Sequence, residues 1–242
     1  MPVAVAVILE YCGGAQTDRL FRSIQEQNPG FPVLVLDNAS PANAASCVTH
    51  RNSVNTFVGG GIKDCIRLAR AHGADFLFFC ANDVEFLGPL DLQLYEDIML
   101  RTPDVVQLSC SLTAESWQAR FFPWQQRRAG TTLRQVRQAD LLACMLRLDF
   151  IEEFGGFPDS ISGWGYSREL AWNARQSGKK ILVSDVCAVH HPAGPKLQLP
   201  SGEFFDKLAE MRSIYVRRYP RQPVLACQTW SPVPDEEAEV LL

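Results

Sequence analysis

The chain of 242 residues is long enough for one domain with a sizeable core, with 47% hydrophobic and 21% charged residues. Its 23 basic and 27 acidic residues give a net charge of −4, which excludes a strongly basic nucleic-acid-binding surface. The composition also excludes collagen-like, coiled-coil and disordered chains. No apolar run approaches the roughly 20 residues that span a bilayer.

The cysteines and the first residues indicate a reducing compartment. None of the eight cysteines forms a Cys-x-x-Cys pair, and several lie within apolar runs, such as the run that ends at Cys80. This pattern favours buried, reduced thiols over a disulfide framework or a zinc site. The first apolar run has no basic residues before it, so no secretory signal is expected. We therefore expect a cytoplasmic protein.

The first half of the chain alternates strand patterns with helix patterns. Apolar β-branched runs are typical of buried strands, and apolar residues at helical spacing predict amphipathic helices. Strands are expected at 2–9, 31–37 and 75–80, with a short one near 54–58. Helices are expected at 15–28 and 61–73. This alternation predicts an α/β fold with a mostly parallel central sheet flanked by helices.

Ligands of such sheets bind where the parallel strands end. Three loops follow the predicted strands directly, at residues 11–14, 37–40 and 81–85. Because the carboxyl ends of parallel strands lie at one edge of the sheet, we expect these loops to meet at a single mouth.

The second half of the chain is less regular and ends in a tail rich in proline and acidic residues. Strands are expected at 104–110 and 181–189, and helices at 167–178 and 203–218. A further apolar run covers residues 139–148. The tail at 221–242 is predicted to be an extended or mobile end.

The segment Ala-Asn-Asp-Val-Glu-Phe, directly after the strand predicted at 75–80, carries the most chemistry. Its carboxylates Asp83 and Glu85 stand at the expected mouth, and Asn82 beside them is a candidate substrate-binding residue. Mg²⁺ and Mn²⁺ prefer carboxylate oxygens, and such an ion can bridge the oxygens of a diphosphate. The alternative is a solvated acidic turn.

Three more residues at the mouth are candidates for binding a ligand. Tyr11 closes the first strand, where its ring could stack on a base, or it is an ordinary tyrosine at the edge of the core. Asp37 closes the second strand, where it could accept hydrogen bonds from a nucleoside, or it forms an Asx-turn. Gly60, in a run of three glycines, would let a ligand approach the backbone, or it belongs to a tight turn.

The second half contributes three further candidates. Trp164, between two glycines, suits the flat face of a sugar, and packing is the alternative. Glu169 lies at the start of a predicted helix, where it is a candidate base or a favourable charge at the helix dipole. His190 follows the last strand, where it could complete a metal site or contact a phosphate.

Residues 113–134 combine aromatic side chains with arginines. The arginines are Arg120, Arg127, Arg128 and Arg134, with Arg137 nearby. We predict that they contact an anionic or lipid-diphosphate acceptor, whereas the alternative is an ordinary solvated loop.

In this order, these segments resemble the family 2 glycosyltransferases, which have the A-type nucleotide-sugar-binding fold. Segment 3–14 is similar to the family's first strand and donor loop, and segment 31–40 to its second strand with an Asp-Asn-x-Ser ending. Segment 54–86 resembles its glycine-bearing loop, helix, strand and metal motif, and segment 150–191 its acceptor half. The likeness rests on the order and spacing of the segments.

The resemblance implies a Rossmann-like glycosyltransferase A-type fold in a single domain at 1–220. Its nucleotide-sugar-binding half would be residues 1–110, and its acceptor half residues 111–220. The implied reaction is an inverting transfer from a nucleotide-diphosphate sugar to a glycan or lipid-linked saccharide, as in polysaccharide biosynthesis, with Mn²⁺ or Mg²⁺ as cofactor. A lipid-linked acceptor would imply peripheral association with a membrane.

The sequence departs from the family at two positions. The metal motif Asp-x-Asp reads Ala81-Asn82-Asp83, so Asp83 would hold the ion with Glu85 or His190. The family's catalytic acid is missing where Tyr166 or Ser167 stands. Glu169 is therefore the predicted base, and Asp159 is the next acid to test.

Two other functions remain open on these residues. Ala81 and Ser167 favour a sugar- or nucleotide-binding relative that has lost turnover. A nucleotidyltransferase has a similar sheet, but it usually carries a glycine-rich, basic loop after the first strand, which residues 11–19 only half match.

Overall fold

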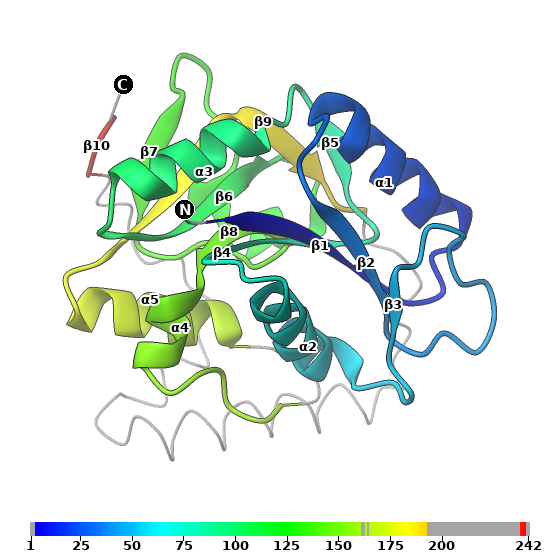
Figure 1. The fold of residues 1–242 in the computed structure, drawn as a ribbon. Helices are drawn as coiled ribbons and strands as arrows, with labels where there is room; N and C mark the ends of the chain where they lie inside the picture. The colour runs from blue at the N-terminus through cyan, green and yellow to red at the C-terminus, as the bar shows by residue number, and fades with distance from the viewer. Residues whose placement is uncertain (1–2, 161–162, 164, 193–237, 241–242) are drawn as a thin grey trace.

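The computed structural model describes residues 3–160, 163, 165–192 and 238–240. Trp164 and the helix expected over 203–218 lie outside these residues. The described residues form a ten-stranded sheet in the order β10-β7-β9-β6-β8-β4-β1-β2-β3, with β5 paired to β9 (Figure 1). No helix within the described ranges is long and apolar enough to cross a membrane.

The first half builds a parallel layer. Its elements are β1 (Ala4–Glu10), α1 (Ala15–Gln27), β2 (Val33–Asp37), β3 (His50–Arg51), α2 (Phe57–Ala71) and β4 (Phe76–Ala81). β1 pairs in parallel with both β2 and β4, and β2 pairs in parallel with β3. The expected alternation of buried strands and helices is therefore confirmed here.

The second half adds strands of both directions. Its elements are β5 (Glu85–Leu87), α3 (Leu92–Arg101), β6 (Val105–Leu112), the 3₁₀ helices η1 (Trp117–Arg120) and η2 (Pro123–Gln125), β7 (Leu133–Val136), β8 (Ala143–Arg147), α4 (Leu148–Glu153), α5 (Tyr166–Gln176), β9 (Lys180–His190) and β10 (Ala238–Val240). The apolar run at 139–148 therefore contains β8. Residues 238–240 of the tail form a short strand against β7.

The sheet is mixed, with most strands in one direction. β8 lies antiparallel between β4 and β6, so β4 and β6 share a direction, and β9 is parallel to β6. β5 and β7 run antiparallel to β9. The prediction of an α/β sheet flanked by helices, mostly parallel in strand direction, is confirmed.

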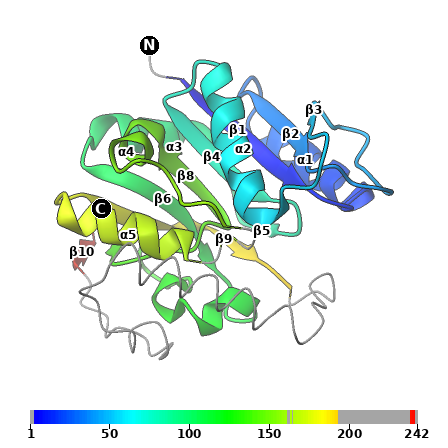
Figure 2. The ribbon, with the colours of Figure 1, turned by 90° about the horizontal axis from the view of Figure 1, so that it is seen from below.

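Helices cover both faces of the sheet. α1 and α3 lie on one face, and α2, α4 and α5 on the other (Figures 1 and 2). Alternate residues of β1 serve the two cores: Ile8 packs with Ile24 of α1 and Met99 of α3, whereas Val7 shares the second core with Cys65 of α2 and Leu170 of α5. This is the two-sided burial that the continuous apolar strands predict.

The prediction for residues 54–61 was wrong. No strand forms at 54–58; β3 lies earlier, at His50–Arg51, and α2 begins at Phe57 and contains Gly59 to Gly61. Glycine disfavours a helix interior, but packing overrides this preference here. A Cβ atom on Gly59 would collide with the carbonyl oxygen of Ser160. Gly59 therefore leaves room for the backbone of Ser160 and Gly163, and Gly61 for the Leu9 side chain.

Candidate active site

One edge of the sheet collects the polar ends of the strands. β1, β2, β4 and β9 end there at Glu10, Asp37, Ala81 and His190. β8 runs in the opposite direction and begins at the same edge, where the Ala81 N–H donates to the Leu142 carbonyl at 2.9 Å. The loops from both halves of the chain therefore meet at this edge.

A buried carboxylate that the sequence analysis overlooked joins two of these loops. Glu10 is 0% exposed and accepts hydrogen bonds from the Gly13 N–H at 2.7 Å and from the Thr17 hydroxyl. It also accepts from Asn82 Nδ2 at 2.7 Å. The Asn82 amide nitrogen therefore faces the protein interior and fixes the turn that carries Asp83. Because β1 is buried on both faces, its sequence has no alternation of apolar and polar residues that would have singled out Glu10.

Asp37 is linked through Ser40 to Cys12, the residue after Tyr11. The Asp37 carboxylate is 0% exposed and accepts from the Ser40 N–H at 3.0 Å and its hydroxyl at 2.6 Å. Its other oxygen forms an ion pair with Arg51 Nε at 3.2 Å, without hydrogen-bond alignment. Cys12 N–H donates to Ser40 Oγ at 2.8 Å, beside the exposed Tyr11 ring. Asp37 thus bonds the backbone three residues on, at Ser40, and a nucleoside contact by Asp37 stays a prediction.

The structure brings Asp83 to His191 rather than to His190. His191 Nε2 lies 3.1 Å from Asp83 Oδ1, and the two side chains are 16% and 31% exposed. His190 lies opposite the exposed Glu85 in the β5–β9 pair, and its Nδ1 lies 3.1 Å from the Thr113 hydroxyl. His190 and His191 therefore point to opposite sides of the end of β9. The sequence alone does not reveal which of two adjacent histidines faces Asp83.

His191 is held in a defined orientation. Its Nδ1 lies 2.7 Å from Gln118 Oε1 in η1, and its backbone N–H donates to Ser116 Oγ at 3.1 Å. The Trp117 N–H donates to the His191 carbonyl, also at 3.1 Å. A hydrogen on Nδ1 that bonds to Gln118 leaves Nε2 as the nitrogen that faces Asp83, which is the tautomer in which Nε2 can bind a metal.

Asp83 and His191 fit a divalent cation as two protein ligands. A carboxylate oxygen and an imidazole nitrogen are both accepted donors for Mn²⁺-type ions, and both side chains are partly accessible. Across the described ranges, no group of three His, Cys, Asp or Glu side chains could hold a metal. The remaining ligands would therefore come from a substrate, such as diphosphate oxygens, and from water.

The α5 side of the edge carries the predicted base Glu169. Glu169, the predicted base, is 2% exposed in the first turn of α5, and its Oε1 lies 3.4 Å from Asn173 Nδ2. Asp159, the reserve candidate, has a fully solvated side chain that pairs with Lys63. Ser167 receives a 3.4 Å hydrogen bond from Gln138 Nε2, so residues 138–142 reach the start of α5.

That 138–142 segment carries a carboxylate that the sequence analysis did not name. Asp140 is half-buried, and its Oδ1 accepts from the Leu141 N–H at 2.9 Å. Burial raises the pKa of Asp140 to about 6, although the Leu141 N–H and the charge of His191 act in the opposite direction. Asp140 precedes an apolar run and belongs to no recognisable motif, so the sequence did not single it out.

The arginines of the 113–137 region do not form one surface. Arg134 is buried in an ion pair with Asp185, at 2.6 Å from Nε to Oδ2, and also donates to the carbonyls of Trp124 and Gln126. Arg127 Nε donates to the Asp185 carbonyl at 3.0 Å. Arg134 thus anchors the segment to β9 and is not available to an acceptor. Acceptor contacts by Arg120, Arg127, Arg128 and Arg137 stay a prediction.

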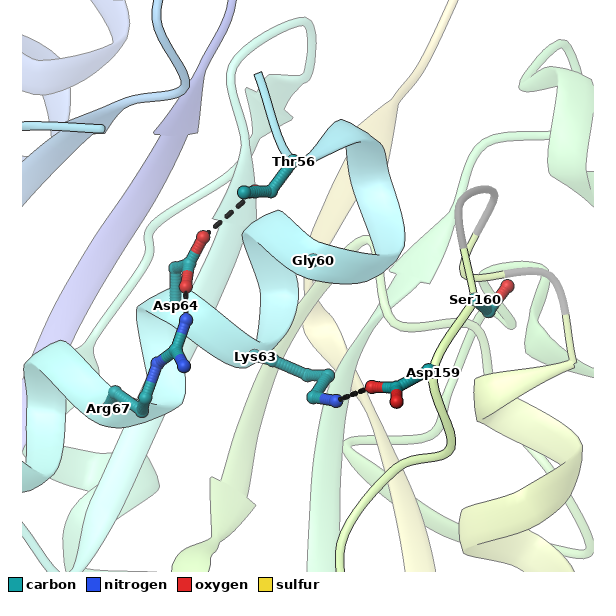
Figure 3. Close-up of a pocket in the computed structure, with 7 residues that line it drawn as sticks. All are labelled: Thr56, Gly60, Lys63, Asp64, Arg67, Asp159 and Ser160. Atoms are coloured by element: carbon teal, nitrogen blue, oxygen red, sulfur yellow. Dashed lines mark hydrogen bonds and ion pairs between the residues drawn. The ribbon is translucent and has the colours of Figure 1, made fainter. Parts of the chain in front are cut away.

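An open pocket of about 400 Å³ lies beside this edge, between α2 and residues 159–160 (Figure 3). Gly60 forms part of its wall, and Lys63 spans it to reach Asp159. On the other side, Asp64 accepts from the Thr56 hydroxyl at 2.8 Å and pairs with Arg67. The charged groups that line the pocket are paired with one another, which favours a connection between α2 and the 159–160 segment over a preformed ligand site.

Comparisons with known proteins place the fold. No protein-family model and no curated protein matches the sequence. The structure is similar to that of GalNAc-T7 with UDP, GalNAc and Mn²⁺, with a TM-score of 0.66 and 11% identity over 89% of this chain. It is also similar to S. aureus TarS, with a TM-score of 0.55 and 11% identity over 94% of this chain.

Both of these structures are A-type glycosyltransferases, so the chain has the A-type glycosyltransferase fold. The chain spans only 48% of the GalNAc-T7 chain and 41% of the TarS chain.

Proposed function

We propose that this protein is a glycosyltransferase that moves a sugar from a nucleotide-diphosphate sugar to a hydroxyl acceptor, with inversion at the anomeric carbon. The observation that carries the proposal is the Asp83–His191 pair at the edge where the parallel strands end. Sheets of this type bind ligands at that edge. GalNAc-T7, which has a similar fold, is described with UDP, GalNAc and Mn²⁺, the class of ligands that this edge would receive.

The chain's own residues have separable roles in this proposal. Asp83 and His191 would hold a divalent cation, which when bound neutralises charge on the leaving diphosphate. Glu10 and Asn82 fix the turn that presents Asp83. Tyr11, 43% exposed, would stack on the base, and Asp37 with Ser40 would shape the nucleoside side of the edge.

The reaction follows as a single displacement. The acceptor oxygen forms a bond to the anomeric carbon as the bond from that carbon to the diphosphate oxygen breaks, and the electron pair leaves with the diphosphate. The acceptor hydroxyl loses its proton to a carboxylate base. A single displacement inverts the anomeric centre, which is why inversion belongs to the proposal.

A donor panel tests the proposal. Purified protein would be incubated with UDP-, GDP- and dTDP-hexoses, with and without Mn²⁺, and the released nucleoside diphosphate measured. We expect release from at least one donor only with Mn²⁺, its loss in Asp83→Asn, and no change in Glu26→Gln, an exposed acid on α1. Metal-independent release that survives Asp83→Asn would contradict the metal assignment.

One observation supports a second candidate, a relative that binds nucleotide sugars without turnover. Only two protein metal ligands meet in the described part of the chain, and the acid of the family motif is replaced at Ala81. Calorimetry with the same donors separates the candidates: binding without release supports the second, and no binding of any nucleoside diphosphate contradicts both. Release of pyrophosphate from a nucleoside triphosphate would instead indicate a nucleotidyltransferase.

A further inference from the structure

The proposed transfer needs a carboxylate that can reach an acceptor hydroxyl, and neither acid from the sequence analysis has that position. Glu169 is 2% exposed within the first turn of α5, beside Asn173. The side chain of Asp159 is 99% exposed and pairs with Lys63. A base must come within roughly 2.6–3.2 Å of the proton that it removes, so a side chain enclosed in its own helix is poorly placed.

Asp140 stands between the two parts of the proposed site. The segment that carries it enters β8 at the edge where β4 ends, since the Ala81 N–H bonds to the Leu142 carbonyl at 2.9 Å. Two residues before Asp140, Gln138 Nε2 donates to Ser167 Oγ at 3.4 Å, at the start of α5. The segment that carries Asp140 therefore runs between the turn that carries Asp83 and the helix where the family's acid is missing.

The backbone of Asp140 is held on both sides. Its N–H donates to Gln125 Oε1 at 2.7 Å, and its carbonyl accepts from Gln107 Nε2 at 3.2 Å. Gln125 and Gln107 are themselves buried, so the clamp is built from groups that solvent does not reach.

The side chain is less constrained than the backbone. Only Oδ1 is bonded, to the Leu141 N–H, and Oδ2 accepts no hydrogen bond from the residues that the structure describes. A backbone held in place and a carboxylate oxygen without a hydrogen bond from a described residue suit a positioned proton acceptor.

We infer that Asp140, and not Glu169, is the carboxylate that removes the proton from the acceptor hydroxyl. This inference rests on the proposed function and names the residue that accepts the proton in the proposed transfer. In the displacement, the acceptor O–H bond breaks as the bond from its oxygen to the anomeric carbon forms, the electron pair of the broken sugar–oxygen bond leaves with the diphosphate, and the proton moves to Asp140 Oδ2.

The electrostatic surroundings are compatible with this role. Burial raises the pKa of Asp140 to about 6, with His191 at the end of β9 opposing the shift. Another titratable neighbour is the Cys144 thiol of β8; burial raises its pKa well above the usual value, so the thiol stays neutral. A base whose pKa lies close to neutrality is ionised at pH 7 and still accepts a proton effectively.

Three variants test the inference: Asp140→Asn, Glu169→Gln and the control Asp97→Asn, a half-buried aspartate on α3. With a donor from the panel above, we expect Asp140→Asn to reduce transfer by about 10²–10⁴-fold. Its affinities for the nucleoside diphosphate and Mn²⁺ should stay within about twofold of the parent, and Glu169→Gln should retain most of the transfer. Circular dichroism and the binding assays confirm that each variant is folded.

The outcomes are distinct. Near-normal transfer by Asp140→Asn, or a large loss confined to Glu169→Gln, overturns the inference and leaves the proposed function intact. A tenfold or greater loss of Mn²⁺ affinity in Asp140→Asn also overturns it, because Asp140 would then be an ion ligand. If the parent protein neither binds nor turns over any nucleotide sugar, the proposed function fails first and the inference fails with it.

Discussion

In the first half of the chain, the buried carboxylates at the sheet edge are the last residues of their strands, whereas His191 and Asp140 of the second half lie outside the strands, where other side chains hold them. Glu10 and Asp37 are the last residues of β1 and β2. His191 and Asp140 instead depend on Gln118 and on Gln125, which hydrogen-bond them from the 3₁₀ helices. Regular strand geometry therefore positions one set, and buried polar contacts position the other. Substitutions in the second half should damage the site by a different route.

The largest effect should come from the buried anchor of the second half. Arg134→Met leaves the Asp185 carboxylate, 0% exposed, without its charged partner. We expect the free energy of unfolding in urea to fall by about 3–5 kcal/mol. The exposed Arg137→Met is the control, and the double variant Arg134→Met with Asp185→Leu should lose less than the single one. A single-variant loss no larger than that of the control would show that the pair is not an anchor.

A smaller loss of unfolding free energy is expected in the first half, where a backbone N–H group is among the donors to the buried carboxylate. Glu10→Gln puts an amide N–H among the donors from Gly13, Thr17 and Asn82. We expect a loss of about 1–3 kcal/mol in unfolding free energy, the cost of a buried polar group that is left without its partner. Amide hydrogen exchange at residues 11–14 should also become faster. If Glu10→Gln matches the exposed control Glu26→Gln in both measurements, the carboxylate does not hold the loops together.

The contact between η1 and His191 predicts a change in metal affinity with little change in stability. Gln118→Leu removes the acceptor that lies 2.7 Å from His191 Nδ1, so the ring loses its preferred tautomer. We expect Mn²⁺ affinity, measured by electron paramagnetic resonance with bound nucleoside diphosphate, to fall about 10–100-fold. ¹⁵N NMR of His191 should show hydrogen on Nδ1 in the parent and a mixture in the variant. Equal Mn²⁺ affinity in Gln118→Leu and in the exposed Gln93→Leu would refute the positioning role.

The smallest effect is a dependence of stability on pH that Asp140 should produce. Its pKa is raised to about 6 in the folded protein from 3.8, so ionisation costs the folded state stability above about pH 6, and the cost disappears as the pH falls towards 4. Allowing for screening by solvent, we expect Asp140→Asn to have a Tm about 2–4 °C above the parent at pH 8, the shift for roughly 1 kcal/mol. The difference should vanish near pH 4. A constant difference at all pH values would mean that packing, not ionisation, causes it.

The sequence predicted the architecture well wherever burial produces a clear pattern. The strands around Ile8, Val35 and Phe78 are buried on both faces, and each was predicted from an apolar run. Most misses have a tertiary cause. α2 includes Gly59 because the backbone of Ser160 and Gly163 occupies the space that a side chain would need. α3 was not predicted, although the Asp91 side chain caps its first turn by accepting from the Leu94 N–H at 2.8 Å.

The candidate site was predictable only in its first half. Asp83 follows a strand that the sequence identifies, and the three predicted loops do meet. His191 and Asp140 could not be selected, because the choice depends on the β5–β9 register and on the insertion of β8 between β4 and β6. These pairings join residues that are at least 35 positions apart, and no local pattern encodes them. Roles for Tyr11, Asp37 and Glu169 remain predictions.

The position of β8 also has a consequence for how the chain folds while it is being synthesised. β4 is complete when residue 81 has been synthesised, and it can pair with β1, but its second neighbour in the sheet is at Ala143–Arg147. During that interval the apolar strand Phe-Leu-Phe-Phe-Cys-Ala has an unpaired edge, the kind of edge that recruits other strands and leads to aggregation. A ribosome-bound chain that stops before residue 143 would therefore depend on chaperones, and fragments that end near residue 110 should be insoluble even though they contain the whole parallel layer.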